Sequence, residues 1–326
     1  MANPASRHPA NAAGPWFVDR SCINCDVSRQ CAPGIFEEVD QQSVVARQPA
    51  SDDERRAAVR ALLACPTGSI GVVGETPATD GVFPEPIAEG VSYCGFTSRD
   101  SFGANSYFVA RPAGNLMVDS PRFVRQLVRA FEAAGGLSRI LLTHRDDVAD
   151  ARRYAAHFGA RVAIHADDSG AAPFATDLLR GREPAALTPT LLVIPVPGHT
   201  RGSVVYLLEG RFLFTGDSLY WSRRKRRLAA FRDACWYSWE EQARSLDRLA
   251  AHCFEWVLPG HGNRAQGEPA RWRRELAQLV TEMGTTTAAA GPGRVRRDRV
   301  RERSPATAQP VRRPEAGRGL HQLRPL

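Results

Sequence analysis

Lysine is almost absent from this chain of 326 residues: Lys225 is the single lysine among its 43 lysine and arginine residues. Long apolar runs are absent too, and without a run of about 18 such residues the sequence predicts no transmembrane helix. The first residues, MANPASRHPANAAG, contain no apolar core and therefore predict no signal peptide. We expect a cytoplasmic protein, whose seven cysteines serve as metal ligands or free thiols rather than disulfides.

The positive charge is confined to one end of the chain. The formal net charge is +8, but residues 284–326 alone hold ten arginines against three acidic residues. The rest of the chain is therefore close to neutral, which does not favour a nucleic-acid partner. Arginine in place of lysine throughout is consistent with a GC-rich coding bias rather than with phosphate recognition.

Composition divides the chain into five segments. Apolar residues make up 43% and charged residues 24%, which is an ordinary globular balance. We expect a disordered N-terminus at 1–13, a compact cysteine-bearing domain at 14–76 and a linker at 77–90. A larger domain follows at 91–283. The Arg- and Pro-rich tail at 284–326 has too few large apolar residues to fold and is expected to be disordered.

Short apolar runs alternate with amphipathic helical patterns across the larger domain. The pattern predicts strands at 105–110, 115–119, 139–143, 161–165, 191–197, 203–210, 211–216 and 256–260. It predicts helices at 121–136, 147–160, 238–252 and 268–283. Strands interleaved with helices indicate a layered α/β domain.

Histidine and aspartate follow four of these predicted strands directly. The residues are His144, Asp146 and Asp147 after RILLT, His199 after LLVIPVPG, Asp217 after RFLFTG, and His261 after WVLPG. Imidazole and carboxylate are ligands for zinc, iron or manganese, and loops at strand ends are where a scaffold presents them. Taken singly, each residue is better explained as a polar loop residue. Together they predict a metal site.

The segments around three of these residues resemble the metallo-β-lactamase superfamily. They are PGHTRGS at 197–203, FTGDSL at 214–219 and LPGHG at 258–262. The resemblance covers about residues 92–283 and implies an αββα sandwich that binds one or two divalent metals. It implies that His199 and His261 bind metal and that Asp217 bridges two metals, with zinc favoured and iron or manganese as alternatives.

The first motif departs from the pattern His-x-His-x-Asp-His of that superfamily. In its place stands Leu142-Thr143-His144-Arg145-Asp146-Asp147. Aligned on the following residue, His144 matches the second histidine, Asp146 the aspartate and Asp147 the last histidine. Aligned on the strand, His144 matches the first histidine and the rest is shortened. We expect all three as metal ligands, with Asp146 also as the base that takes a proton from the attacking water.

The altered motif leaves the metal and the reaction open. Carboxylates in place of histidines favour a harder metal such as iron or manganese, or a weakened or single-metal site. A metal that polarises a carbonyl and lowers the pKa of bound water toward ~7 supports hydrolysis of an ester, thioester, lactam or phosphoester. Fold alone does not choose among these bonds.

Two other classes of function remain as alternatives. The first alternative is a redox protein, because superfamily members with iron also reduce oxygen or nitric oxide. A degenerate, non-catalytic binding domain is the other, although the intact His199, Asp217 and His261 argue against it. We expect a small-molecule substrate, and the basic run Arg223–Arg227 either steers an anionic one or is a solvated loop.

Four cysteines lie in the first 65 residues. The segment WFVDRSCINCDVSRQCAPGIF holds Cys22, Cys25 and Cys31, and Cys65 begins CPTGSI. A Cys-x2-Cys pair with a distant Cys-Pro suggests an iron–sulfur cluster held by four thiolates. The block resembles a single-cluster ferredoxin of the 4Fe–4S type, which implies a small α+β domain and an electron-transfer partner. Similar modules precede some metallo-β-lactamase-like domains.

This block also departs from its family pattern, because Ser28 stands where a third closely spaced cysteine belongs. In a helix, residue 31 lies ~4.5 Å further along the axis than residue 28, so Cys31 replaces it only if the loop moves. A weak oxygen ligand, a three-iron cluster and a lost cluster with buried thiols all remain open. A zinc site is disfavoured because there is no second closely spaced cysteine pair.

Overall fold

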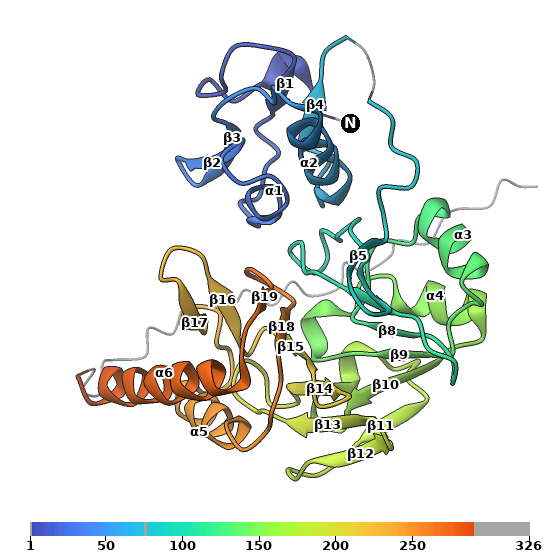
Figure 1. The fold of residues 1–326 in the computed structure, drawn as a ribbon, viewed down its shortest axis with the longest axis vertical. Coiled ribbons are helices and arrows are strands. Elements are labelled where there is room, and N and C mark those ends of the chain that lie inside the picture. Colours follow the sequence, from blue (N-terminus) through green and yellow to red (C-terminus); the bar gives the residue numbers. More distant parts are fainter. Residues whose placement is uncertain (1, 75–76, 290–326) are drawn as a thin grey trace, which may run out of the picture. The chain divides into compact units, whose positions relative to one another are not determined.

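The structure is a computed structural model that describes residues 2–74 and 77–289 (Figure 1). Of the tail at 284–326, which we expect to be disordered, residues 284–289 belong to helix α6 (Pro269–Ala289), and the residues from 290 lie outside the described part of the chain. Among the described helices, none is both long enough and apolar enough to cross a membrane. Residues up to Ala289 form one compact unit.

The first part of the chain is a small α+β block. Its elements are η1 (Pro4–Ser6), β1 (Trp16–Val18), α1 (Val27–Cys31), β2 (Phe36–Val39), β3 (Gln42–Val45), α2 (Asp52–Ala64) and β4 (Ile70–Val72). Strand β1 pairs antiparallel with β4, and β2 pairs with β3. Helix α2 begins at a capping box, in which Ser51 and Glu54 each accept a hydrogen bond from the other's backbone N–H.

The structure differs from the expectation of disorder over residues 1–13. The backbone N–H of His8 donates to the carbonyl of Val18 at 2.9 Å. The side-chain oxygen of Asn11 accepts from the backbone N–H of Val18 at 3.1 Å and of Val45 at 2.9 Å. A polar segment is thus ordered because it satisfies backbone groups that β1 and β3 leave unpaired.

Two sheets make up the larger part of the chain. The first has the order β11-β10-β9-β8-β7-β6-β5. Its strands are β5 (Glu85–Ala88), β6 (Val91–Tyr93), β7 (Tyr107–Val109), β8 (Leu116–Val118), β9 (Arg139–Leu141), β10 (Arg161–His165) and β11 (Asp177–Leu179). Strands β8 to β11 run parallel, and the others are antiparallel. Strand β5 lies within the segment that we expect to be a linker.

The second sheet has the order β12-β13-β14-β15-β18-β19. Its strands are β12 (Ala185–Thr188), β13 (Leu191–Pro195), β14 (Val204–Leu208), β15 (Phe212–Gly216), β18 (Trp256–Pro259) and β19 (Ala265–Gln266). A separate hairpin, β16 (Tyr220–Ser222) and β17 (Arg227–Ala229), carries four basic residues at its tip. Short 3-10 helices η2 (Arg145–Asp147) and η3 (Ala166–Ala171) follow β9 and β10.

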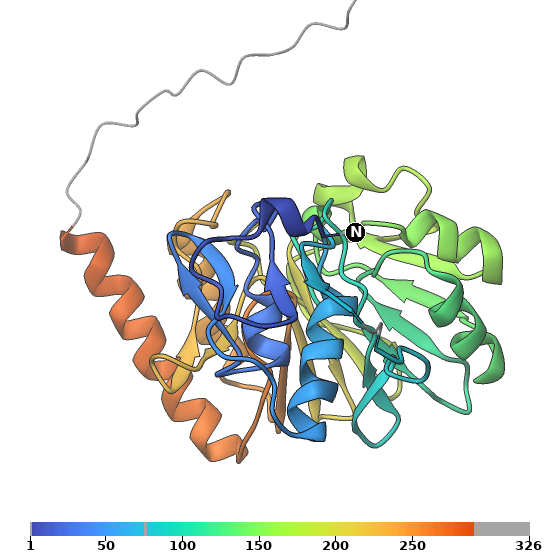
Figure 2. The same cartoon turned by 90° about the horizontal axis from the view of Figure 1, so that it is seen from above.

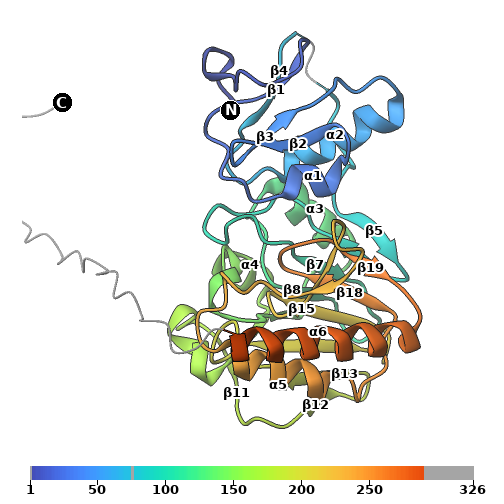
Figure 3. The same cartoon turned by 90° about the vertical axis from the view of Figure 1, so that its left-hand side faces the viewer.

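The sheets pack face to face and helices cover their outer faces. Tyr107, Phe214 and Leu258 belong to the apolar core between the sheets. Helices α3 (Arg125–Ala133) and α4 (Ala151–Phe158) cover the first sheet, and α5 (Trp239–Leu249) and α6 (Pro269–Ala289) lie together on the second. Figure 2 shows the green and the orange helices on opposite sides of the strands, and Figure 3 shows α5 beside α6. The observed architecture is the αββα sandwich that the sequence predicts.

Candidate metal centre

Four strands bring polar side chains from distant parts of the sequence to one place. His144 follows β9, His199 follows β13, Asp217 follows β15 and His261 follows β18. Strands β15 and β18 are parallel neighbours, so Asp217 and His261 leave the sheet at the same edge. All four side chains are buried or nearly so.

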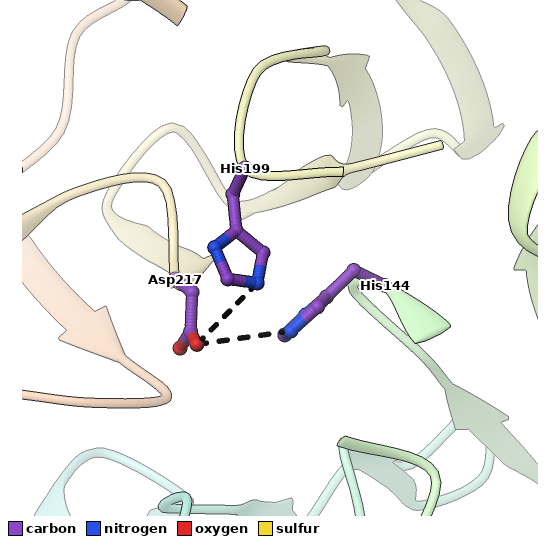
Figure 4. A group of neighbouring side chains, drawn as sticks. All are labelled: His144, His199 and Asp217. Atoms are coloured by element: carbon purple, nitrogen blue, oxygen red, sulfur yellow. Dashed lines mark ion pairs between the residues drawn. The ribbon is translucent and has the colours of Figure 1, made fainter. Parts of the chain in front are cut away.

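The first group of possible ligands consists of His144, His199 and Asp217. The carboxylate Oδ2 of Asp217 lies 3.7 Å from Nε2 of His199 and 3.8 Å from Nε2 of His144. Figure 4 shows the three side chains pointing toward one another. Their ligand atoms all lie within 4.8 Å of one another, a spacing that one metal ion can span.

The second group consists of Asp147, Asp217 and His261, and it shares Asp217 with the first. Here Nδ1 of His261 lies 2.8 Å from Oδ1 of Asp217. Two ligand groups that share one carboxylate are the arrangement in which two metal ions lie side by side. The second group has two carboxylates and one imidazole, so it suits a harder ion than the first group does.

Buried polar atoms without partners test whether these residues fit metal ions. Nε2 of His144, Nε2 of His261 and both carboxylate oxygens of Asp147 are buried and make no hydrogen bond. An unsatisfied buried polar group costs ~1–3 kcal/mol. Four such atoms at one site are explained if they are metal ligands. The residues of both ligand groups therefore fit divalent metal ions.

Thr143 and Asp119 fix the orientation of His144. The hydroxyl of Thr143 donates to the carboxylate of Asp119 at 2.9 Å and lies 3.0 Å from Nδ1 of His144. Because the hydroxyl proton goes to Asp119, its oxygen accepts from Nδ1–H of the imidazole. This leaves the Nε2 lone pair of His144 available to a metal. Burial also lowers the pKa of His144 to about 4, so the ring is neutral at physiological pH.

Asp217 and His261 form a charged pair without metal. Burial alone raises the pKa of Asp217, but the charge and hydrogen bond of His261 bring that pKa below its usual value. Burial alone lowers the pKa of His261, but the charge and hydrogen bond of Asp217 raise it above its usual value. A carboxylate that is ionised throughout the physiological range is ready to bind cations.

The pKa values of Asp147 and Asp119 are raised, in contrast to that of Asp217. Burial, and then the neighbouring carboxylate of Asp217, raise the pKa of Asp147 well above its usual value. Burial also raises the pKa of Asp119, to about 7, although the hydrogen bonds from Thr143 lower it. Several carboxylates thus share a buried site, where a cation would relieve the repulsion among them.

Asp146 lies beside these groups and is the most exposed of the acidic residues here. Its Oδ2 lies 3.3 Å from Nε2 of His199 and 4.0 Å from Nε2 of His144. The hydrogen bond with His199 lowers the pKa of Asp146, so its carboxylate is ionised at neutral pH. The structure therefore brings together all six residues that the sequence singles out, with Asp146 facing solvent rather than within either group.

Gly260 permits the close approach of the two carboxylates. A Cβ atom at this position would lie 2.7 Å from Oδ2 of Asp147 and 2.7 Å from Oδ1 of Asp217. No side chain fits there, so the glycine before His261 is required by packing.

Three further residues support the centre, although the sequence does not single them out. Asp119 follows β8 directly and Thr143 lies two positions after β9, and such a position after an apolar strand is a usable signal. Asp168 is buried, accepts from the backbone N–H of Arg145 at 3.0 Å and of Gly202 at 3.1 Å, and so ties the loop of His144 to that of His199. Asp168 lies in a short polar segment with no pattern that distinguishes it.

A cavity of about 1280 Å³ opens onto both ligand groups. Asp146, His199, Asp217 and His261 line its floor. Its walls carry Arg145, Arg223 and Arg224 and the exposed rings of Phe102 and Trp236. Asp26, Glu38 and Asp100 line the cavity as well, so it combines charged groups of both signs with apolar surface.

A second, smaller pocket lies in the N-terminal block. Cys22, Cys25 and Cys65 line it together with Ser28. The sulfur of Cys22 accepts a hydrogen bond from the backbone N–H of Ser43 at 3.3 Å, and the sulfur of Cys65 accepts one from Ser69 at 3.3 Å. Convergent thiols that receive backbone N–H groups fit the ligands of an iron–sulfur cluster.

Cys31 does not line this pocket. Burial raises the pKa of its thiol to about 12, and its charged neighbours are Arg264, Glu85, Arg60 and Asp26. The structure thus brings together three of the four cysteines that the sequence singles out.

Comparison with known families agrees with this fold and this centre. The family model described as the metallo-beta-lactamase superfamily matches residues 89–279, so the chain belongs to that superfamily. A second family model, the 4Fe-4S single cluster domain of Ferredoxin I, matches residues 18–72. Both resemblances that the sequence suggests are confirmed.

Curated relatives match each part separately. The hydroxyacylglutathione hydrolase of Acidiphilium cryptum is 37% identical over 145 residues, which cover 40% of this chain and 56% of that protein. Ferredoxin-1 of Streptomyces griseolus is 37% identical over 62 residues, which cover 18% of this chain and 90% of that protein. The chain thus spans about half the length of the curated hydrolase.

Solved structures resemble the larger part of the chain. ETHE1 from Myxococcus xanthus has a TM-score of 0.45 at 21% identity, covering 61% of this chain and 92% of that chain. The metallo-beta-lactamase FIM-1 from Pseudomonas aeruginosa, in its mono-zinc form, has a TM-score of 0.47 at 18% identity, covering 62% and 94%.

Proposed function

We propose that this protein is a metal-dependent hydrolase that cleaves a small anionic thioester. The observation that carries the proposal is a single cavity lined by members of both ligand groups, which share Asp217, and by Arg145, Arg223 and Arg224. The curated hydroxyacylglutathione hydrolases, named for a thioester substrate, support the choice of bond.

Each side chain at the metal centre would have a distinct role in hydrolysis. His144, His199 and Asp217 would hold one ion, and Asp147, Asp217 and His261 the other. Bound divalent ions polarise the substrate carbonyl and make hydroxide available at neutral pH. Asp146 is ionised and reaches the cavity, so its carboxylate accepts the proton that the attacking water loses.

Positive charge on the β16–β17 hairpin would select an anionic substrate. Arg223 and Arg224 are exposed and line the cavity, and no ion pair among residues 2–74 and 77–289 involves either one. Unpaired cations at the mouth of a cavity attract an anion and raise its local concentration. Phe102 and Trp236 would pack against the apolar part of the substrate.

Replacing both arginines is the test of this assignment. We expect Arg223→Ala with Arg224→Ala to raise KM for a hydroxyacylglutathione about 3–30-fold at low salt, because exposed ion pairs contribute ~0.3–1 kcal/mol each. We expect kcat to stay close to wild type, and the difference in KM to shrink as salt is added.

Lys225→Ala with Arg226→Ala is the matched control. These two residues lie on the same hairpin and are exposed, but they do not line the cavity. An equal rise in KM in both double variants would show that only overall charge matters. Failure of the metal-loaded wild type to cleave thioesters above its metal-free rate would overturn the proposed function itself.

One observation favours a redox protein as the second candidate. Cys25 lines the cavity that His261 also lines. A Cβ atom on Gly103 would lie 3.0 Å from the sulfur of Cys25, and the ring of the adjacent Phe102 lies 6.3 Å from the ring of His261. The loop at 102–103 therefore connects a possible cluster ligand with a possible metal ligand.

Spectroscopy distinguishes the two candidates. If the protein is a redox protein, a cluster held by the cysteines of the N-terminal block would supply one electron to a ferric ion held by the metal centre, which would become ferrous. Mössbauer spectra of the iron-loaded chain, reduced without air by one electron from a chemical donor, would then show ferrous iron in the metal centre. A centre that stays ferric beside a reduced cluster would exclude this candidate.

A further inference from the structure

Three thiols line the pocket of the N-terminal block, whereas a four-iron cluster is held by four thiolates. Cys22, Cys25 and Cys65 line it, and the remaining cysteine of the block, Cys31, does not. Ser28 also lines the pocket and is buried. The chain therefore departs from a full set of four thiolates in a way that the structure makes specific.

Helix α1 explains why Ser28 and Cys31 point to different surroundings. The helix has only five residues, with Ser28 in its first turn and Cys31 at its end. Cys31 packs partly buried against the apolar core, and its charged neighbours include Arg264 and Glu85. Because α1 is also packed against α2, moving Cys31 into the pocket would require the helix to unwind or shift.

The hydroxyl of Ser28 is already engaged in a hydrogen bond. It donates to Oγ of Ser43 at 3.0 Å, and Arg29 donates to the same oxygen at 2.7 Å. The backbone N–H of Ser43 in turn donates to the sulfur of Cys22. A neutral hydroxyl held in this way is a much weaker ligand for iron than a thiolate, which is soft and charged.

We propose that Cys22, Cys25 and Cys65 are the three thiolate ligands of the cluster and that Ser28, not Cys31, faces its fourth corner. The iron at that corner lacks a thiolate and is bound less tightly than the other three. This inference concerns the N-terminal block alone and does not rest on the proposed hydrolase activity.

The test is the iron content of the full chain, reconstituted with iron and sulfide without air. Zinc is supplied to the metal centre so that iron reports on the cluster alone. After a mild chelator, we expect about three irons per chain in wild type and about four in Ser28→Cys, which completes a set of four thiolates. Electron paramagnetic resonance should change from the three-iron to the four-iron type.

Two further variants keep the test decisive. Cys31→Ser, or Cys31→Ala if the serine variant folds poorly, should retain the iron content and the spectrum of wild type. Cys65→Ser should lose iron and sulfide. Loss of iron on replacement of Cys31, or a Ser28→Cys variant with the same iron content as wild type, would overturn the proposal.

Discussion

Replacing Asp217 by alanine is expected to empty both ligand groups and to lower the rate of hydrolysis about 10³-fold. Asp217 is the residue that the two groups share, so its loss removes one ligand from each. The loss also leaves His261 without the charge that pairs with it. The ions contribute several kcal/mol to the transition state, and each 1.36 kcal/mol is worth a factor of ten.

Metal content is the primary measurement for this variant, with the hydrolysis rate beside it. Asp247→Ala on the exposed face of α5 is the control, because it removes the same charge far from any ligand group. Full metal retention by a folded Asp217→Ala variant would contradict the assignment of the centre.

Replacing Asp147 by asparagine is expected to remove only one of the two ions. Asp147 belongs to the second group, and the first group of His144, His199 and Asp217 stays complete. The amide has nearly the same shape as the carboxylate but cannot supply a charged oxygen. Equilibrium dialysis with manganese should therefore give one ion per chain, against two for wild type and for the control Asp247→Asn.

The same carboxyl group predicts how metal binding depends on pH. Burial raises the pKa of Asp147, so in the metal-free protein this group holds a proton at pH values where an exposed aspartate is ionised. The second ion must displace that proton, and its affinity should rise about tenfold per pH unit below the raised pKa. Occupancy of the second site that does not change with pH would contradict it.

The sequence predicts much of the sandwich because its strands are short apolar runs. The predicted strand at 161–165 coincides with β10, and the predicted helix at 238–252 contains α5. The sequence pattern does not predict strands β5 and β16, because their residues are mixed in polarity and mostly only partly buried. Their pairing is decided by neighbouring strands rather than by their own pattern.

The residues of the metal centre likewise differ in whether a local sequence pattern predicts them. His199, Asp217 and His261 follow apolar strands and have glycine neighbours, so their positions carry a signal in the sequence. The role of Asp168 depends on contacts with residues more than 20 positions away, which no local pattern encodes. The different surroundings of Ser28 and Cys31 likewise come from the packing of α1, which spacing along the chain does not reveal.

The most direct test of the account is the electron paramagnetic resonance spectrum of the full chain loaded with manganese. Manganese is a hard ion that prefers carboxylate and imidazole to the thiols of the N-terminal block. If Asp217 bridges two ions, the spectrum should show an exchange-coupled pair, and Asp147→Asn should convert it to that of a single ion. Two uncoupled ions in wild type, or one ion at saturation, would contradict a centre built on a shared Asp217.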